Sequence, residues 1–181
     1  MPPIIIGIIG PIRAGKTTSS KYICKKYNYQ LASNSSLLSQ ILNNMNIPTT
    51  RYNLAKLGDS IFEVMGNDII ARHRIAHHKS HDTMVIDGIR YIEEVEYYRK
   101  TSRFKLLGIS CLEQIRFNRA LQKNHTGKDL NLTINSFREI SANRSESNIP
   151  LLMSRADSII ENNTSLAELG KKIDIIMSKW T

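Results

Sequence analysis

The chain has 181 residues, of which 41% are hydrophobic and 23% are charged, and its net charge is +9. This length fits one domain, residues 1–181, with a core large enough to fold without disulfides or metals, and no apolar run is long enough to span a bilayer. The positive charge favours anionic partners, nucleotides or nucleic acid alike. Because the basic residues form no block, a compact phosphorylated substrate explains the charge at least as well as a nucleic-acid track.

Apolar runs of strand length recur along the chain and alternate with segments that favour helices. We expect strands over residues 4–9, 29–32, 83–88, 104–110 and 157–161. We expect helices over residues 18–27, 37–42, 54–65, 68–75, 91–100, 112–123, 133–146 and 165–180. Residues 124–131 are polar and predict an exposed loop, and residues 150–153 form a short apolar patch. The alternation predicts an α/β fold with a mainly parallel sheet and helices on both faces.

A complete phosphate-binding loop, G-x-x-x-x-G-K-T, runs from Gly10 to Thr17. The apolar strand at residues 4–9 precedes it and a helical segment follows, which is the context that this motif requires. We therefore interpret the apolar N-terminal run as structure and not as a signal peptide, and we place the protein in the cytoplasm. A chance match is the alternative, and the flanking strand and helix make it improbable.

The residues of this loop suit the binding of ATP and Mg²⁺. Glycines let backbone N–H groups approach an anion, and the helix that begins near Gly15 or Lys16 directs its positive end to the same place. Lys16 can reach the β- and γ-phosphates, and the Thr17 hydroxyl can bind Mg²⁺. Arg13 either helps to hold phosphate or is solvated, and the sequence does not separate the two. The candidate ATP-binding set is Gly10, Arg13, Ala14, Gly15, Lys16, Thr17 and Thr18.

Asp87 ends the buried strand at residues 83–88, and ligands of parallel α/β sheets bind at the carboxyl ends of strands. A role beside the phosphate loop is therefore favoured over a simple turn cap. Arg90 either contacts a phosphate or pairs with Glu93 or Glu94 on the surface. Arg116 and Arg119 lie one turn apart, and a solvated helix face is an equal alternative for one of them.

The remaining reactive residue types suggest no further site. Cys24 and Cys111 show neither a C-x-x-C nor a zinc spacing, and we expect both to pack as small apolar residues in a reduced cytoplasm. His73 and His77 are four residues apart and could bind a metal, but an exposed polar helix face is favoured because no H-E-x-x-H pattern accompanies them. No N-K-x-D guanine signature occurs, which argues against a Ras-like GTPase.

Several stretches together resemble the P-loop nucleoside monophosphate kinase superfamily. Within it the chain is most similar to dephospho-CoA kinase-like and archaeal adenylate-kinase-related proteins, over nearly its whole length. The residues that carry the likeness are the phosphate loop, Ile47–Leu54, Gly66–Arg72, the D-G-I-R run Asp87–Arg90 with Glu93–Glu96, Arg116, Arg119 and Ala156–Asn162. The chain departs from the pattern at Leu38–Gln40, where many such kinases have an arginine, and in the loop 124–131.

The resemblance implies a three-layer P-loop NTPase fold with a five-stranded parallel sheet of order 2-3-1-4-5. It implies a small lid-like segment around residues 122–147. It also implies catalytic roles for Lys16, Asp87, Arg116 and Arg119, and an acceptor site with Arg51, Arg90 and Arg138, with Arg144 an alternative to Arg138 in the lid.

These observations predict an ATP-dependent small-molecule kinase that acts on a nucleoside or deoxynucleoside monophosphate. Dephospho-CoA is an alternative acceptor within this class. A nucleic-acid-directed kinase or ATPase, which the charge of +9 would suit, and a non-catalytic nucleotide sensor remain as other classes.

Overall fold

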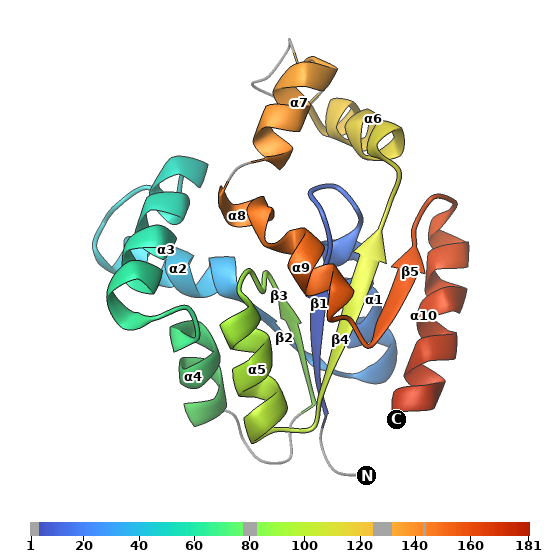
Figure 1. Cartoon of the computed structure of the whole chain (residues 1–181), viewed down its shortest axis with the longest axis horizontal. Helices are drawn as coiled ribbons and strands as arrows, with labels where there is room; N and C mark the ends of the chain where they lie inside the picture. Colours follow the sequence, from blue (N-terminus) through green and yellow to red (C-terminus); the bar gives the residue numbers. More distant parts are fainter. Residues whose placement is uncertain (1–3, 78–82, 125–131, 143) are drawn as a thin grey trace.

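A computed structural model describes residues 4–77, 83–124, 132–142 and 144–181 (Figure 1). Its centre is one parallel sheet of five strands in the order β2-β3-β1-β4-β5. This order confirms the expected 2-3-1-4-5 arrangement. The strands are β1 (Ile5–Ile9), β2 (Gln30–Ser33), β3 (Met84–Asp87), β4 (Phe104–Ser110) and β5 (Ser158–Glu161).

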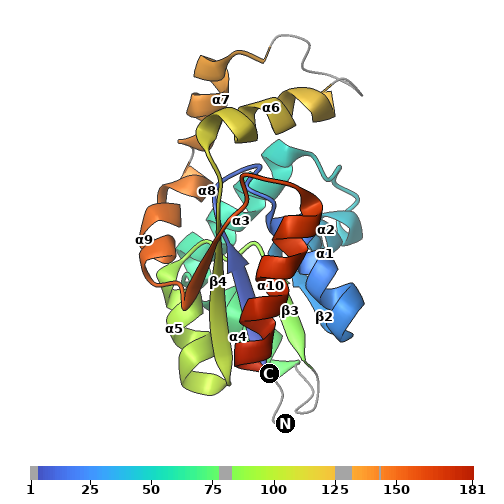
Figure 2. The same ribbon diagram turned by 90° about the vertical axis from the view of Figure 1, so that its right-hand side faces the viewer.

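Helices cover both faces of this sheet, as expected. In Figures 1 and 2, α1 and α10 lie on one face, and α5 and α9 lie on the other. The helices are α1 (Lys16–Tyr27), α2 (Asn34–Asn44), α3 (Arg51–Met65), α4 (Ile69–Ala76), α5 (Ile92–Thr101), α6 (Glu113–Asn124), α7 (Ile134–Ser141), α8 (Arg144–Ser147), α9 (Ile149–Ser154) and α10 (Leu166–Trp180).

The isoleucines around β1 explain why the chain forms a sheet with two covered faces. Successive side chains of a strand point to opposite faces. Ile4, Ile6 and Ile8 therefore join the core beneath α1 and α10, while Ile5 and Ile9 join the core beneath α5 and α9. All five are at most 2% exposed. A continuous apolar run at this position thus specifies a central strand that is buried on both sides.

Two local expectations need correction. The helix expected over residues 133–146 is divided into α7 and α8, and residue 143 between them lies outside the described residues. The apolar patch around Pro150 is the helix α9, in which the proline occupies the first turn. Proline is tolerated there because the amides of the first turn have no partner within the helix.

The topology brings the candidate site residues to one edge of the sheet. Ile8 of β1 is in register with Asp87 of β3, so the phosphate loop begins beside the end of β3. In both views α6 and α7 stand beyond this carboxyl edge (Figures 1 and 2). The exposed loop predicted over residues 124–131 lies outside the described residues, apart from Asn124 at the end of α6. Across the described part of the chain, no helix is long and apolar enough to cross a membrane.

Candidate phosphate-binding site

The backbone of the phosphate loop has a shape that only glycine fits at its two ends. Gly10 and Gly15 have φ angles of +148° and +110°. A Cβ atom on Gly10 would lie 2.2 Å from the backbone oxygen of Ile109 in β4. Arg13, which also has a positive φ of 63°, makes the turn between them. The loop is therefore a backbone cradle seated directly on the end of the sheet, the geometry needed for anion binding.

Lys16 folds over this cradle. Its ammonium donates hydrogen bonds to the backbone oxygens of Gly10 (2.7 Å) and Pro11 (3.0 Å). Burial lowers the pKa of Lys16 to about 8, and the positive charges of Arg90 and Arg116 contribute to this shift. The carboxylates of Glu146 and Asp87 oppose it. A desolvated ammonium near the guanidinium groups of Arg90 and Arg116 strongly attracts a polyphosphate.

Thr17 and Asp87 meet at the start of α1. The Thr17 hydroxyl donates to Asp87 Oδ2 over 3.0 Å. A hydroxyl and a carboxylate at hydrogen-bond distance are hard oxygen ligands of the kind that Mg²⁺ prefers. The residues present therefore fit a magnesium ion beside the phosphate loop, and Asp87 lies where the sequence placed it.

Arg119 and Asn162 support the loop through its backbone carbonyls. Asn162 Nδ2 donates to the Ala14 oxygen over 2.7 Å, and a Cβ on Gly15 would lie 2.3 Å from that nitrogen. Arg119 donates to the Asn162 oxygen (2.9 Å) and to the oxygens of Arg13 and Ala14 (both 3.4 Å). These contacts suit a positioning role for Arg119. Asn162, which comes directly after β5, is therefore part of this support.

Arg116 lies one turn earlier on α6 and also contacts the loop. Its Nη1 donates to the Ile12 oxygen over 3.2 Å, and its guanidinium lies 5.5 Å from the centre of the Phe137 ring in α7. A cation over an aromatic face is held by the ring quadrupole. Arg116 thus links the phosphate loop to both α6 and α7.

Arg90 pairs with Glu146 of α8, and this pair touches the phosphate loop. The Arg90 guanidinium forms an ion pair with Glu146 Oε1, while Glu146 Oε2 accepts a hydrogen bond from the Ile12 amide over 3.1 Å. The sequence offered a surface pair with Glu93 or Glu94 as the alternative for Arg90. The ion pair that Arg90 forms is with Glu146 instead. Glu146 had no signal in the sequence, because a single acidic residue in a polar segment fits a solvated surface equally well.

Of the other residues predicted for the acceptor side, only Arg138 has a described side chain, and its ion pair is not with the phosphate loop. Arg138 pairs with Glu113 on the surface, with Nη2 2.7 Å from Oε1. Thr18, which was predicted for ATP binding and not for the acceptor, directly follows the loop and is exposed on the first turn of α1. Arg51 begins α3, but its side chain lies outside the described residues, as does that of Arg144.

A buried carboxylate braces the segment between Asp87 and α5. Glu94 is fully buried and accepts hydrogen bonds from the amide of Arg90 (2.9 Å) and from Asn34 Nδ2 (2.8 Å). Asn34 also donates to the Gly88 oxygen over 3.2 Å. Burial raises the pKa of Glu94 to about 7, against the lowering effect of these donors. The network fixes the turn that carries Asp87 and Arg90.

The raised pKa predicts a measurable pH dependence of stability. Between pH 4.5 and about 7 the folded protein retains the Glu94 proton that the unfolded chain loses, so stability falls as pH rises through this window. The full shift corresponds to a contribution on the order of 3 kcal/mol. We expect Glu94→Gln to remove this part of the decline. Urea unfolding at pH 5 and pH 7.5 gives, for each protein, the change in the free energy of unfolding between the two pH values. We expect this change to be smaller in Glu94→Gln, and the contributions of other titrating groups cancel in the comparison. An equal change in both proteins would contradict the assignment.

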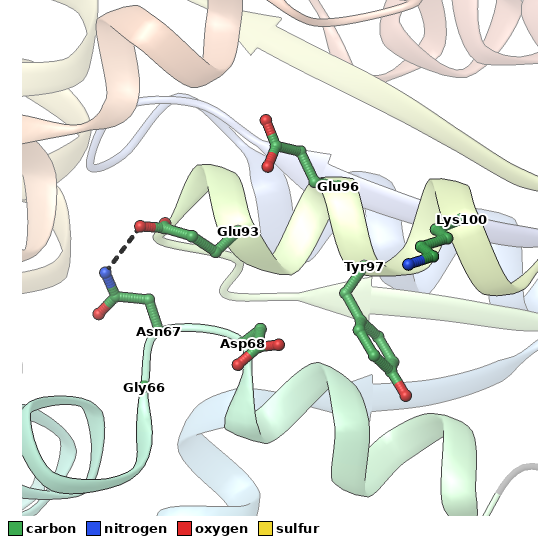
Figure 3. Close-up of a pocket in the computed structure, with 7 residues that line it drawn as sticks. All are labelled: Gly66, Asn67, Asp68, Glu93, Glu96, Tyr97 and Lys100. Atoms are coloured by element: carbon green, nitrogen blue, oxygen red, sulfur yellow. Dashed lines mark hydrogen bonds between the residues drawn. The ribbon is translucent and has the colours of Figure 1, made fainter.

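A surface pocket of about 470 Å³ lies away from the phosphate loop, between the α3–α4 connection and α5 (Figure 3). Its lining includes the carboxylates of Asp68, Glu93 and Glu96, with Lys100 at one end. Asn67 Nδ2 donates to Glu93 Oε1 over 3.0 Å across it. Three carboxylates against one ammonium repel phosphate, so the candidate site remains the loop and not this hollow.

Cys24 and Cys111 pack against the core as expected, and His73 and His77 lie exposed on α4. Cys24 and Cys111 are free and partly buried against the core, and burial raises the pKa of both thiols. The rings of His73 and His77 are 4.3 Å apart on α4. Among the described residues there is no group of three or more His, Cys, Asp or Glu side chains that could hold a metal ion without further ligands.

Comparison with known proteins places this site in a family. A model described as an AAA domain matches residues 9–134, well over half of the chain. The chain belongs to the AAA domain family. The match begins at the last residue of β1 and includes the whole phosphate loop, Asp87, Arg90 and α6. This AAA domain family is a P-loop kinase family, which confirms the resemblance to P-loop kinases.

Relatives of this AAA domain are distant in sequence. It is 25% identical to the UPF0200/UPF0201 protein of Archaeoglobus fulgidus, covering 97% of this chain but only 55% of that protein. It is 24% identical to a UPF0200 protein of Methanocaldococcus jannaschii, covering 97% and 90% of the two chains. Shikimate kinase from Bacteroides thetaiotaomicron superposes with a TM-score of 0.62 at 16% identity, over 98% and 99% of the chains. That similarity establishes the fold.

Proposed function

We propose that this protein is an ATP-dependent phosphotransferase that acts on a nucleoside or deoxynucleoside monophosphate. One observation carries the proposal: beside a complete phosphate loop, the Thr17–Asp87 contact provides oxygen ligands for a metal, and Arg90 faces the loop from the end of the neighbouring strand. A site that only bound a nucleotide would not need a cation on that side. The fold and the family support a P-loop kinase, and the choice of acceptor is our inference.

In this proposal the loop holds the donor and β3 provides the acceptor side. Backbone amides of the loop between Ile12 and Thr18 are proposed to face the phosphates of ATP, and Lys16 contributes its ammonium. Thr17 and Asp87 hold Mg²⁺, which would neutralise phosphate charge. Arg116 and Arg119 keep the loop rigid through its carbonyls. Lys16 and the metal ion would be the preorganised cations that stabilise the charge spreading over the transferred group.

Arg90 is proposed to contact the acceptor's phosphate, with Arg51 and Arg138 as further candidates. The acceptor's phosphate charge must be met by a fixed cation. Loss of Arg90 should therefore weaken binding of the acceptor and leave binding of MgADP nearly unchanged. We expect Arg90→Ala to raise the acceptor KM or to lower kcat by about 10–100-fold, while the Kd of MgADP changes little. Arg72→Ala is the matched control, since Arg72 pairs with Asp68 on the surface. Acceptor kinetics equal to wild type in Arg90→Ala would refute this role.

The function itself is tested by ADP release from MgATP with a panel of acceptors. The panel should contain the ribo- and deoxynucleoside monophosphates, dephospho-CoA, shikimate and a short RNA. Strong stimulation by a nucleoside monophosphate, toward the roughly 1–100 s⁻¹ typical of kinases, is the expected result. Stimulation by dephospho-CoA or shikimate alone would keep a kinase and change its substrate.

The other classes predict different results in the same assay. A nucleic-acid-directed enzyme, which the net charge of +9 would suit, should bind RNA or DNA with an affinity that falls steeply with salt. A nucleotide sensor should bind ATP and show no stimulation by any acceptor. We place the protein in the cytoplasm as part of the proposal.

A further inference from the structure

A carboxylate of the chain itself occupies the anion-binding side of the phosphate loop. Glu146 is 8% exposed although it is charged, and both of its oxygens have cationic or amide donors. Oε1 pairs with the Arg90 guanidinium, and Oε2 accepts the Ile12 amide over 3.1 Å. Its charge also acts on the ammonium of Lys16. Buried carboxylates are costly unless they are paired, so these donors define a genuine anion site.

The donors around Glu146 are those expected for a phosphoryl group. Arginine guanidinium and loop amides are standard phosphate ligands, and a carboxylate presents oxygens to them with similar spacing. The first turn of α1 is the natural place for the diphosphate part of a nucleotide, because the helix N-terminus and Lys16 are there. Arg90 follows β3, from which the proposed acceptor is approached. Glu146 bonds both to the Ile12 amide of the loop and to Arg90, so its carboxylate stands between the loop and Arg90.

We propose that Glu146 holds the position of the transferred γ-phosphoryl group when no substrate is bound, and that ATP must displace it. This inference rests on the proposed function. Two anions cannot share the site, since like charges at contact repel strongly and the same donors cannot serve both. ADP, which lacks the γ-phosphoryl group, leaves Glu146 in place. Glu146 thereby determines how strongly the protein distinguishes the triphosphate from the diphosphate.

Displacement has a consequence for the acceptor. Arg90 is engaged by Glu146 until the carboxylate leaves, so the cation proposed for the acceptor is released by the binding of ATP. Glu146 lies on α8, which is directly followed by α9 on the sheet. In that connection Asn148 Nδ2 donates to the Arg90 oxygen over 3.2 Å. ATP binding is thus coupled both to the Arg90 side chain and to the segment that joins α7 to α9.

Nucleotide affinities of Glu146→Gln test the proposal. The glutamine keeps the size of the side chain and removes its charge, which removes repulsion and frees Arg90. Only the state in which Glu146 has left the site binds MgATP. Because this is a minor state of the wild type, the apparent Kd of MgATP equals the intrinsic Kd divided by the fraction of protein in that state. We expect Glu146→Gln to tighten MgATP about tenfold and to change MgADP by less than about twofold. Glu139→Gln is the matched control: it makes the same charge change on exposed α7 and should leave both affinities unchanged.

A measurement on the wild type keeps the test independent of the variant's folding. Amide hydrogen exchange of residues 144–154 should be faster with saturating MgATP than with saturating MgADP, because only the triphosphate expels the carboxylate. An unchanged ratio of the two affinities in Glu146→Gln, or equal exchange with both nucleotides, would overturn the inference while leaving the proposed kinase intact. A change in acceptor KM without a change in that ratio would also overturn it. Failure of every protein to bind either nucleotide would instead overturn the proposed function, and this inference with it.

Discussion

Lys16→Ala is expected to lower kcat by about 10²–10³-fold while the protein remains folded. The ammonium lies over the loop, bonded to the oxygens of Gly10 and Pro11, where it would meet the charge that develops on the transferred phosphoryl group. Burial lowers the pKa of Lys16 to about 8, so its charged form is a cost to folding. The free energy of unfolding of the variant should therefore equal or exceed that of the wild type.

Steady-state kinetics with the preferred acceptor and a urea unfolding curve together check this prediction. Lys25→Ala is a suitable control, because Lys25 is an exposed lysine on the same helix α1. The control should retain the kcat of the wild type. A Lys16→Ala variant with kcat within threefold of the wild type would show that the loop does not act on the transferred group. A variant that is inactive because it is unfolded would show that Lys16 stabilises the fold. That result would contradict the destabilisation that its lowered pKa implies.

The residues that could be predicted from the sequence are those whose roles depend on local chain geometry. The phosphate loop is contiguous, so its motif and its flanking strand and helix were enough. Asp87 followed from a topological rule, because the carboxyl ends of parallel strands share one edge. The same rule applied to β5 would have indicated Asn162, which comes directly after that strand and supports Ala14.

The contacts that could not be predicted join residues far apart in the chain. Glu146 reaches Ile12 across 134 positions, and nothing in the amino-acid pattern of α8 specifies this approach. The arginines illustrate the same limit. Their number near the site was evident, but the direction of a long side chain is set by its tertiary partners: loop carbonyls for Arg119, a surface glutamate for Arg138. Sequence alone thus indicated the kind of site more reliably than its individual contacts.

Gly10→Ala is expected to destabilise the fold on the order of 3 kcal/mol or more. Two effects add at this residue. Its φ of +148° is unfavourable for a side chain, and the added methyl carbon would lie 2.2 Å from the Ile109 oxygen, a backbone atom of the central sheet that cannot move aside. The loop would have to lift away from β4, which would also displace the Gly10 oxygen that holds Lys16. Urea unfolding and the Kd of MgADP measure the two consequences.

Gly66→Ala separates these two effects. Gly66 also has a positive φ, +91°, at the end of α3, but an added Cβ would lie 3.4 Å from the nearest side-chain oxygen, an ordinary contact. With ψ of 154°, Gly66 lies in a region that essentially only glycine adopts, so backbone strain alone should cost roughly 1–3 kcal/mol there, with MgADP binding unchanged. If Gly10→Ala is no more destabilising than Gly66→Ala, the close approach of the loop to β4 does not hold in solution. A much larger loss at Gly10, accompanied by weaker MgADP binding, would mean that the end of β4 sets the shape of the phosphate cradle.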